Sequence, residues 1–113
     1  MTKVRERGKS RARLEKRVDE TLYLTKKRGG GVLKEEVWYE GEQVVKYSLA
    51  YINTAICAAD NGRVLGYNKD HGVHHRHFMG SFEEIDFAGY EALVDRFQQE
   101  VERLWSKQDA KTR

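Results

Sequence analysis

The sequence contains no proline and only one cysteine, Cys57. A single cysteine excludes a disulfide within the chain, and this usage is typical of proteins in a reducing compartment. Long apolar runs are also missing, because 35% of the 113 residues are charged and no run is long enough to span a bilayer. The segment Met1–Arg13 has no apolar stretch of the secretory type. We therefore expect a cytoplasmic protein with no membrane partner.

Several familiar motifs are missing as well. The glycine run Gly29–Gly31 lacks the Gly-Lys-Ser/Thr ending of a phosphate-binding loop, so we interpret it as a flexible turn. Cys57 lies in an apolar stretch, where a buried small side chain is expected instead of a nucleophile. Nothing in the pattern indicates a bound cofactor.

The charge is unevenly distributed. Residues 1–28 contain eleven Lys/Arg and four Asp/Glu, whereas the remainder contains ten and fourteen. A basic leading segment attracts phosphates or an acidic partner, or it serves as a solvated tail. We divide the chain into a basic N-terminal segment, 1–20, that is flexible or partly helical over Ser10–Glu20; an α+β domain, 21–107; and a polar tail, 108–113. Lys3–Arg17 is predicted to be a docking arm outside the domain.

Strand-forming segments alternate with turn signals from Thr21 onward. In the best of them, Val44–Ile56, large apolar residues recur at every second position, which indicates a strand with one buried face. Asn61-Gly62 accepts the positive φ angles of a tight hairpin turn. The predicted strands are Thr21–Thr25, Val32–Tyr39, Val44–Ile56, Arg63–Asn68 and Val73–Met79.

The last element is predicted to be an amphipathic helix that begins after Asp86 as its N-cap. Its apolar residues recur at spacings of three and four. Four acidic residues are expected on its outer face: Glu91, Asp95, Glu100 and Glu102. The predicted fold is therefore α+β, an antiparallel meander of about five strands packed against this helix. Its core should contain Val45, Leu49, Phe97 and Val101.

All four histidines lie between His71 and His77, next to Arg76. Alternation along a strand would place His75 and His77 on one face, and His74 and Arg76 on the other. Gly66 on the partner strand would leave room for a bulky neighbour. Four histidines so close together favour a functional segment over a polar surface hairpin without a function.

One interpretation is RNA cleavage without a metal, which needs a base for the ribose 2′-OH, an acid for the leaving oxygen and cations around the phosphate. Histidine suits both proton transfers because its ordinary pKa lies near neutrality. The predicted catalytic residues are His75, His77, His74, His71, Arg76 and Tyr67. The predicted phosphate-binding residues are Arg63, Lys69, Lys26, Lys27 and Arg28.

Two alternatives remain. The His-x-His pair with Asp70 or His71 could bind a metal, although the spacing matches no closed zinc site and nearby positive charge opposes a dication, so no metal ligand is predicted. The chain could also be a non-enzymatic nucleic-acid-binding or regulatory module that uses its arginines and basic segment without turnover.

Three segments together resemble a known family: Lys46–Asn53, Asp60–Asn68 and His71–His77. They are similar to the TumE-type toxins of prokaryotic type II toxin–antitoxin systems, with the pattern Arg-x-x-x-Tyr-[Asp/Asn]-x-x-His-Gly-x-His-His-x-His. The resemblance covers about Thr21 to Trp105, and the position that the family fills with aspartate is Asn68 here. It implies a growth inhibitor that is restrained by a helix-turn-helix antitoxin. The proposed RNA substrate and the ribonuclease step come from the residue chemistry.

Overall fold

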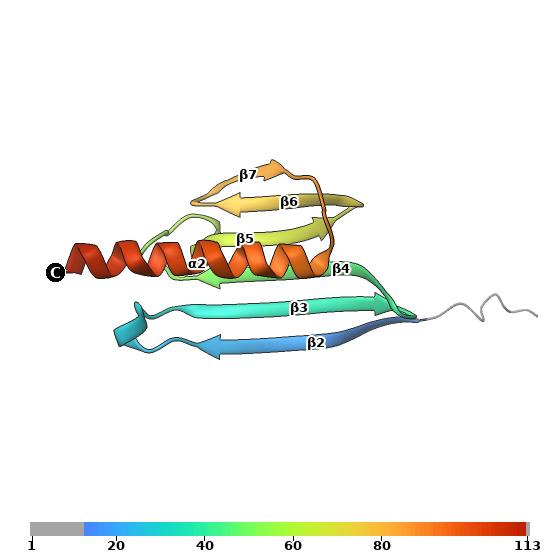
Figure 1. Cartoon of the computed structure of the whole chain (residues 1–113), viewed down its shortest axis with the longest axis horizontal. Helices are drawn as coiled ribbons and strands as arrows, with labels where there is room; N and C mark the ends of the chain where they lie inside the picture. The colour runs from blue at the N-terminus through green and yellow to red at the C-terminus, as the bar shows by residue number, and fades with distance from the viewer. Residues whose placement is uncertain (1–12, 113) are drawn as a thin grey trace, which may run out of the picture.

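The computed structural model describes residues 13–112, which form a six-stranded antiparallel sheet and a C-terminal helix (Figure 1). The strands are hydrogen-bonded in chain order, so the sheet is a meander and the predicted α+β class is confirmed. The elements are β2 (Leu14–Tyr23), the 3₁₀ turn η1 (Lys26–Arg28), β3 (Val32–Glu40), β4 (Gln43–Ile52), the 3₁₀ turn η2 (Asp60–Gly62), β5 (Arg63–Asp70), β6 (Val73–Phe78), β7 (Ser81–Glu84) and α2 (Tyr90–Thr112). The strand missed from the sequence is β7, whose four residues are all exposed and show no apolar alternation.

Helix α2 lies over β4 and β5 on one side of the sheet (Figure 1). We call this side the helix face and the other side the open face, because no helix of residues 13–112 covers it. The core fills the space between α2 and the sheet, and all its aromatic and aliphatic residues are buried. Its central members are Tyr47, Leu49, Tyr51, Leu65, Tyr67, Leu93, Phe97 and Val101.

Leu49, Phe97 and Val101 share this core as predicted, but Val45 does not. The pairing of β3 with β4 shifts at a β-bulge, and Val44 packs against the core in place of Val45. A bulge inserts one extra residue into a strand and reverses the alternation beyond it. Simple period-two counting therefore places this one valine on the wrong face.

The predicted helix over Ser10–Glu20 is wrong for its described part. Leu14–Tyr23 form strand β2, which pairs along its length with β3, while residues 10–12 lie outside the described residues. Two apolar residues give a short helix little to bury, and such helices are marginal in water. The unpaired edge of β3 offers backbone hydrogen bonds instead, and the ion pair of Lys16 with Glu36 supports the pairing.

The connection between β4 and β5 is longer than a two-residue hairpin. Asp60 and Asn61 adopt φ angles of 53° and 55°, so the expected positive φ is present, but within η2. Buried Asn53 fixes the loop, because its backbone N–H donates to the Gly62 carbonyl at 2.7 Å and its side chain donates to the Gly29 carbonyl at 3.0 Å. This arrangement fixes the start of β5, where Arg63 lies.

Helix α2 begins at Tyr90, four residues after the predicted N-cap Asp86. Phe87 precedes the helix and stacks on His74 instead of lining the helical stripe. The helices of residues 13–112 include none that is both long enough and apolar enough to cross a membrane.

Candidate functional site

The β5–β6 hairpin carries the histidine segment, and its register decides which side chains share a face. Gly66 pairs with His77 and Asn68 pairs with His75, all on the open face. Tyr67 pairs with Arg76 and Lys69 with His74, on the helix face. The alternation expected from the sequence is therefore present, and the candidate residues form two separate groups. The six-residue strand β6 contributes to both.

The open-face group centres on two imidazole rings. The ring centroids of His75 and His77 are 6.1 Å apart. Phe82 of β7 lies beside both, with its centroid 5.6 Å from that of His75 and 5.7 Å from that of His77. Two imidazoles at this separation can contact two oxygens of one phosphodiester.

His77 is held at both ring nitrogens. An Nη2–H of Arg63 donates to Nδ1 at 3.0 Å, and Nε2 lies 3.0 Å from Oδ1 of Asn68. Because a guanidinium can only donate, Nδ1 carries the lone pair and Nε2–H donates to Asn68. Burial and the charge of Arg63 lower the pKa of His77 below its ordinary value. The imidazole is therefore neutral near pH 7, with its basic nitrogen at Nδ1.

Gly66 makes the approach of Arg63 possible. A Cβ atom at position 66 would lie 2.6 Å from Cδ of Arg63, so any larger residue would displace the arginine. Asp60 fixes the other end of the guanidinium, with Nε donating to its Oδ2 at 2.8 Å. The space left by the missing side chain of Gly66 is thus filled by Arg63, whose side chain passes over Gly66 to reach His77 on β6.

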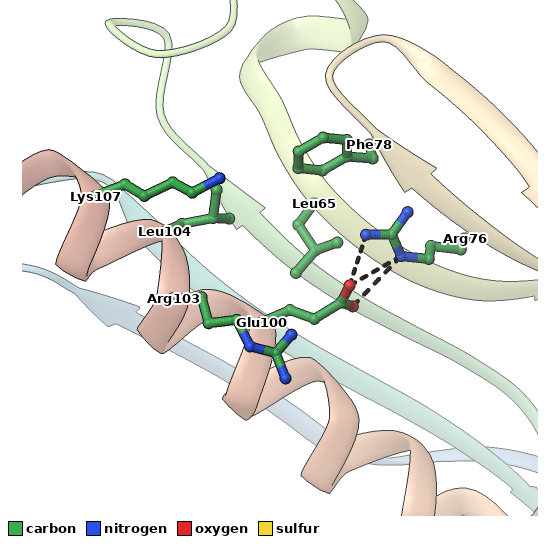
Figure 2. A pocket seen from close by; sticks show the side chains of 7 residues that line it. All are labelled: Leu65, Arg76, Phe78, Glu100, Arg103, Leu104 and Lys107. Carbon is green, nitrogen blue, oxygen red and sulfur yellow. Dashed lines mark hydrogen bonds and ion pairs between the residues drawn. The ribbon is translucent and has the colours of Figure 1, made fainter.

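The helix-face group is a partly buried ion pair, shown in Figure 2. Nη2 of Arg76 lies 2.6 Å from Oε2 of Glu100, and their side chains are 17% and 15% exposed. The hydroxyl of Tyr67 donates to Glu100 and accepts from Nε of Arg76. Burial, followed by Glu100, raises the pKa of Tyr67 to about 12, so its hydroxyl keeps the proton. Burial alone would raise the pKa of Glu100, but its hydrogen bonds with Arg76 and Tyr67 lower it overall.

A hollow of about 160 Å³ opens beside this ion pair, between β6 and α2 (Figure 2). It combines apolar walls with basic side chains from the helix, and its lining residues are Leu65, Arg76, Phe78, Glu100, Arg103, Leu104 and Lys107. The carboxylate of Glu100 already neutralises the guanidinium of Arg76. This hollow is on the side of the sheet away from His75 and His77.

His74 is a packed residue of the helix face. The hydroxyl of Tyr47 lies 2.8 Å from its Nδ1, and its ring stacks on Phe87 with centroids 4.1 Å apart. Burial raises the pKa of Tyr47 to about 12, so the phenol is the donor. Burial, and then the charges of Lys69 and His75, lower the pKa of His74.

The remaining predicted residues lie apart from both groups. His71 is in the tight turn between β5 and β6, with its side chain 92% exposed and 3.5 Å from Asp70. Lys26, Lys27 and Arg28 form η1 between β2 and β3, so β3 and β4 separate them from the histidine hairpin. The structure does not bring these residues to the His75–His77 pair.

Three residues of these groups were not identified from the sequence: Asp60, Phe82 and Glu100. Glu100 was expected on the outer face of the helix, but it points at the sheet and binds Arg76. The signal was available, because Glu100 is three residues after Phe97 and four before Leu104, both of which contact the core. No local pattern marks Phe82, whose contacts depend on strand pairing. Among residues 13–112, no three His, Cys, Asp or Glu side chains are arranged to hold a metal ion.

Comparison with known proteins identifies the family. A family model described as Toxin TumE matches residues 2–105, which is most of the chain. No match was found among curated proteins or among solved structures. The match includes the whole histidine hairpin and most of α2. The chain therefore belongs to the toxin TumE family, and as the toxin component of a toxin–antitoxin system it has an antitoxin as partner.

Proposed function

We propose that this toxin is a metal-independent endoribonuclease whose catalytic residues lie on the open face of the sheet. The observation that carries the proposal is the pair His75–His77, 6.1 Å apart, with Arg63 bonded to the basic nitrogen of His77. A neutral base, a second imidazole and a cation are the groups that cleavage of RNA by its own 2′-OH requires.

His77 is assigned as the base. Its Nε2–H is bound to Asn68, which fixes the tautomer and directs the lone pair of Nδ1 toward Arg63. When a phosphate binds, the guanidinium of Arg63 moves onto its oxygens and releases Nδ1. Nδ1 then takes the proton of the 2′-OH as the 2′-oxygen bonds to phosphorus.

His75 is assigned as the acid, acting in its imidazolium form. It gives its proton to the 5′-oxygen as the P–O5′ bond breaks, so the products are a 2′,3′-cyclic phosphate and a 5′-hydroxyl. Arg63 stabilises the charge that builds on the phosphorane oxygens. The same guanidinium, 3.0 Å from Nδ1, opposes a dication at this nitrogen, which is why no metal is assigned to the step.

The remaining predicted residues have other positions. Arg76, Tyr67 and His74 are engaged on the helix face, and His71 lies at the hairpin tip. We assign Arg76 and Tyr67 to stability, because their polar groups are bound to Glu100.

The test is cleavage of RNA by purified toxin in the presence of a chelator, with the new ends identified chemically. We expect full activity in chelator and 2′,3′-cyclic phosphate ends. His75→Ala and His77→Ala should each lower the rate at least a hundredfold, which is the typical contribution of one acid or base. His71→Ala is the matched control and should retain the activity of the native chain, since it removes the same residue type from an exposed turn.

Other outcomes would decide against the proposal. Ends with a 3′-hydroxyl, or activity that returns only when zinc or manganese is added, would indicate a metal-dependent nuclease. Tight RNA binding without cleavage, sensitive to salt and to loss of Arg63, would indicate the non-enzymatic binding module instead.

A further inference from the structure

Phe82 is an exposed aromatic residue that the fold does not need for its core. It lies on β7, an edge strand whose four residues are all exposed, and its own relative exposure is 68%. An aromatic side chain left in water forgoes most of the free energy that its burial would provide. In the register it pairs with His77, so it faces the open side next to the proposed catalytic pair.

The geometry around Phe82 leaves room for another ring. Its plane is inclined by 31° to that of His77 and by 82° to that of His75. The three ring centroids form a triangle with sides of 5.6, 5.7 and 6.1 Å, so both imidazoles lie on the same side of Phe82, and its 68% exposure leaves other parts of the ring in water. A planar apolar group could stack there while a phosphate contacts the histidines.

The charged residues around Phe82 favour one position for the phosphate. Glu84 pairs with His75 in the register, so its carboxylate disfavours a phosphate on that side. On the other side Arg63 supplies a cation against His77; Asp60 bonds its Nε, while its Nη2 points to His77. The phosphate is therefore expected near Arg63 and His77, with an attached base reaching outward over Phe82.

We propose that Phe82 stacks on the base of an unpaired nucleotide next to the cleaved phosphate, so that the substrate class is single-stranded RNA. This inference rests on the proposed ribonuclease function of the same site. In an RNA duplex both faces of a base are covered by its neighbours, and only a base out of the stack can lie on an aromatic side chain. Stacking of this kind also tolerates any base, because every base has a π-face.

The experiment is a double-mutant cycle between protein and substrate. Native toxin and Phe82→Ala are compared on a short single-stranded RNA and on two versions that lack the base on either side of the cleaved phosphate. On intact RNA, Phe82→Ala should lower kcat/KM about tenfold, mainly through KM. On one of the two abasic substrates the same substitution should change kcat/KM less than twofold. Phe82→Trp should preserve cleavage, whereas Phe82→Leu should resemble Phe82→Ala.

The matched control is Tyr23→Ala, which removes an aromatic residue with 77% exposure from the other edge strand, β2. It should leave all three substrates unaffected. An equal loss on intact and abasic RNA, or a Phe82→Leu variant as active as the native chain, would overturn the stacking role and leave Phe82 as a packing contact of the histidines. A shifted pH profile of kcat in Phe82→Ala would likewise indicate that Phe82 acts by packing against the histidines and not by stacking on a base.

Failure of the ribonuclease proposal can be told apart from failure of this inference. If native toxin cleaves no RNA, the cycle is repeated as a binding measurement on oligomers with a 2′-deoxy nucleotide at the central position. A tenfold weaker affinity of Phe82→Ala that disappears on an abasic oligomer would still support stacking. Equal affinities of the two proteins would reject it.

Discussion

The two faces of the β5–β6 hairpin use the same residue types for different purposes. On the helix face, Arg76 is bound by Glu100 and Tyr67, and His74 is packed against aromatic rings. On the open face, Arg63 donates a hydrogen bond to the basic nitrogen of His77, and the imidazoles of His75 and His77 remain partly exposed. The carboxylate of Glu100 lies against the guanidinium of Arg76, whereas Asp60 pairs with Arg63 and its Oδ2 lies 3.9 Å from Nδ1 of His77.

This difference shows that a cluster of histidines and arginines in a sequence is not one site. Adjacent residues on a strand point to opposite sides, so one cluster is divided between the interior and the surface. The helix face should therefore contribute to folding free energy and the open face to turnover. Substitutions on each face test whether this separation holds.

The largest effect is expected from Glu100→Gln on the helix face. Removing the charge of Glu100 leaves the guanidinium of Arg76 with the exposed carboxylate of Glu83 as its remaining ion-pair partner among the described residues, so the free energy of unfolding should fall by about 3 kcal/mol. Urea unfolding at pH 7 measures it. Glu83→Gln is the control, because Glu83 also bonds Arg76 but is 61% exposed and should cost less than about 1 kcal/mol. Equal losses for the two variants would contradict a special role for the Arg76–Glu100 pair.

The same pair predicts a pH dependence of stability. The pKa of Glu100 is lowered in the folded chain, so its stabilising contribution is present above about pH 4.5, its ordinary value, and is lost as the pH falls through the folded pKa. The stability difference between the native chain and Glu100→Gln should therefore shrink on acidification. A difference that stays constant down to pH 3 would show that the carboxylate is not the source.

An intermediate effect is expected from Asn68→Asp on the open face. A carboxylate at Nε2 favours the imidazolium form, so the pKa of His77 should rise by about one unit. The acid limb of kcat/KM should move to higher pH by the same amount, and titration of the His77 ring by NMR measures the pKa directly. An unshifted acid limb, with a shifted His77 titration, would show that His77 is not the base.

Asn68→Asp should also change how the free energy of unfolding depends on pH. In the native chain the lowered pKa of His77 means that protonation opposes folding as the pH falls through its ordinary value of 6.5. Because Asn68→Asp raises the folded pKa, it removes part of this penalty, and the variant should gain stability relative to the native chain at pH 5.5 compared with pH 8. Unfolding of both proteins at pH 5.5 and pH 8 tests the sign.

The smallest effect is expected from Tyr47→Phe on the helix face. The variant loses the hydrogen bond to Nδ1 of His74, which should cost about 1 kcal/mol of unfolding free energy. RNA cleavage should not change, because His74 points away from the open face. A stable Tyr47→Phe protein without activity would place His74 in the catalytic site and would break the division between the two faces.

Much of the fold could be predicted from local patterns. Val44–Ile56 and the apolar stripe of the C-terminal helix show clear periodicities, so the sheet, the helix and most of the core were expected. Strand β7 and the first part of β2, before Thr21, were missed, because their residues are largely exposed and their stability comes from hydrogen bonds to a neighbouring strand. The strand propensity of a segment does not show whether a neighbouring strand has an edge free to pair with it.

The sequence by itself determined that the histidines gather on one hairpin, that His75 and His77 share a face and that Gly66 lies opposite a bulky residue. These follow from the two-residue period of a strand and from its register in a short hairpin. Only the tertiary structure decided that Glu100 neutralises Arg76, that Arg63 crosses Gly66 to reach His77 and that Phe82 lies beside both imidazoles. The contacts of Arg63 with His77 and of Arg76 with Glu100 join residues 14 and 24 positions apart, and the place of Phe82 depends on the pairing of β7 with β6. Packing therefore decides which groups pair, because a charged group that loses contact with water needs an oppositely charged or hydrogen-bonding partner nearby.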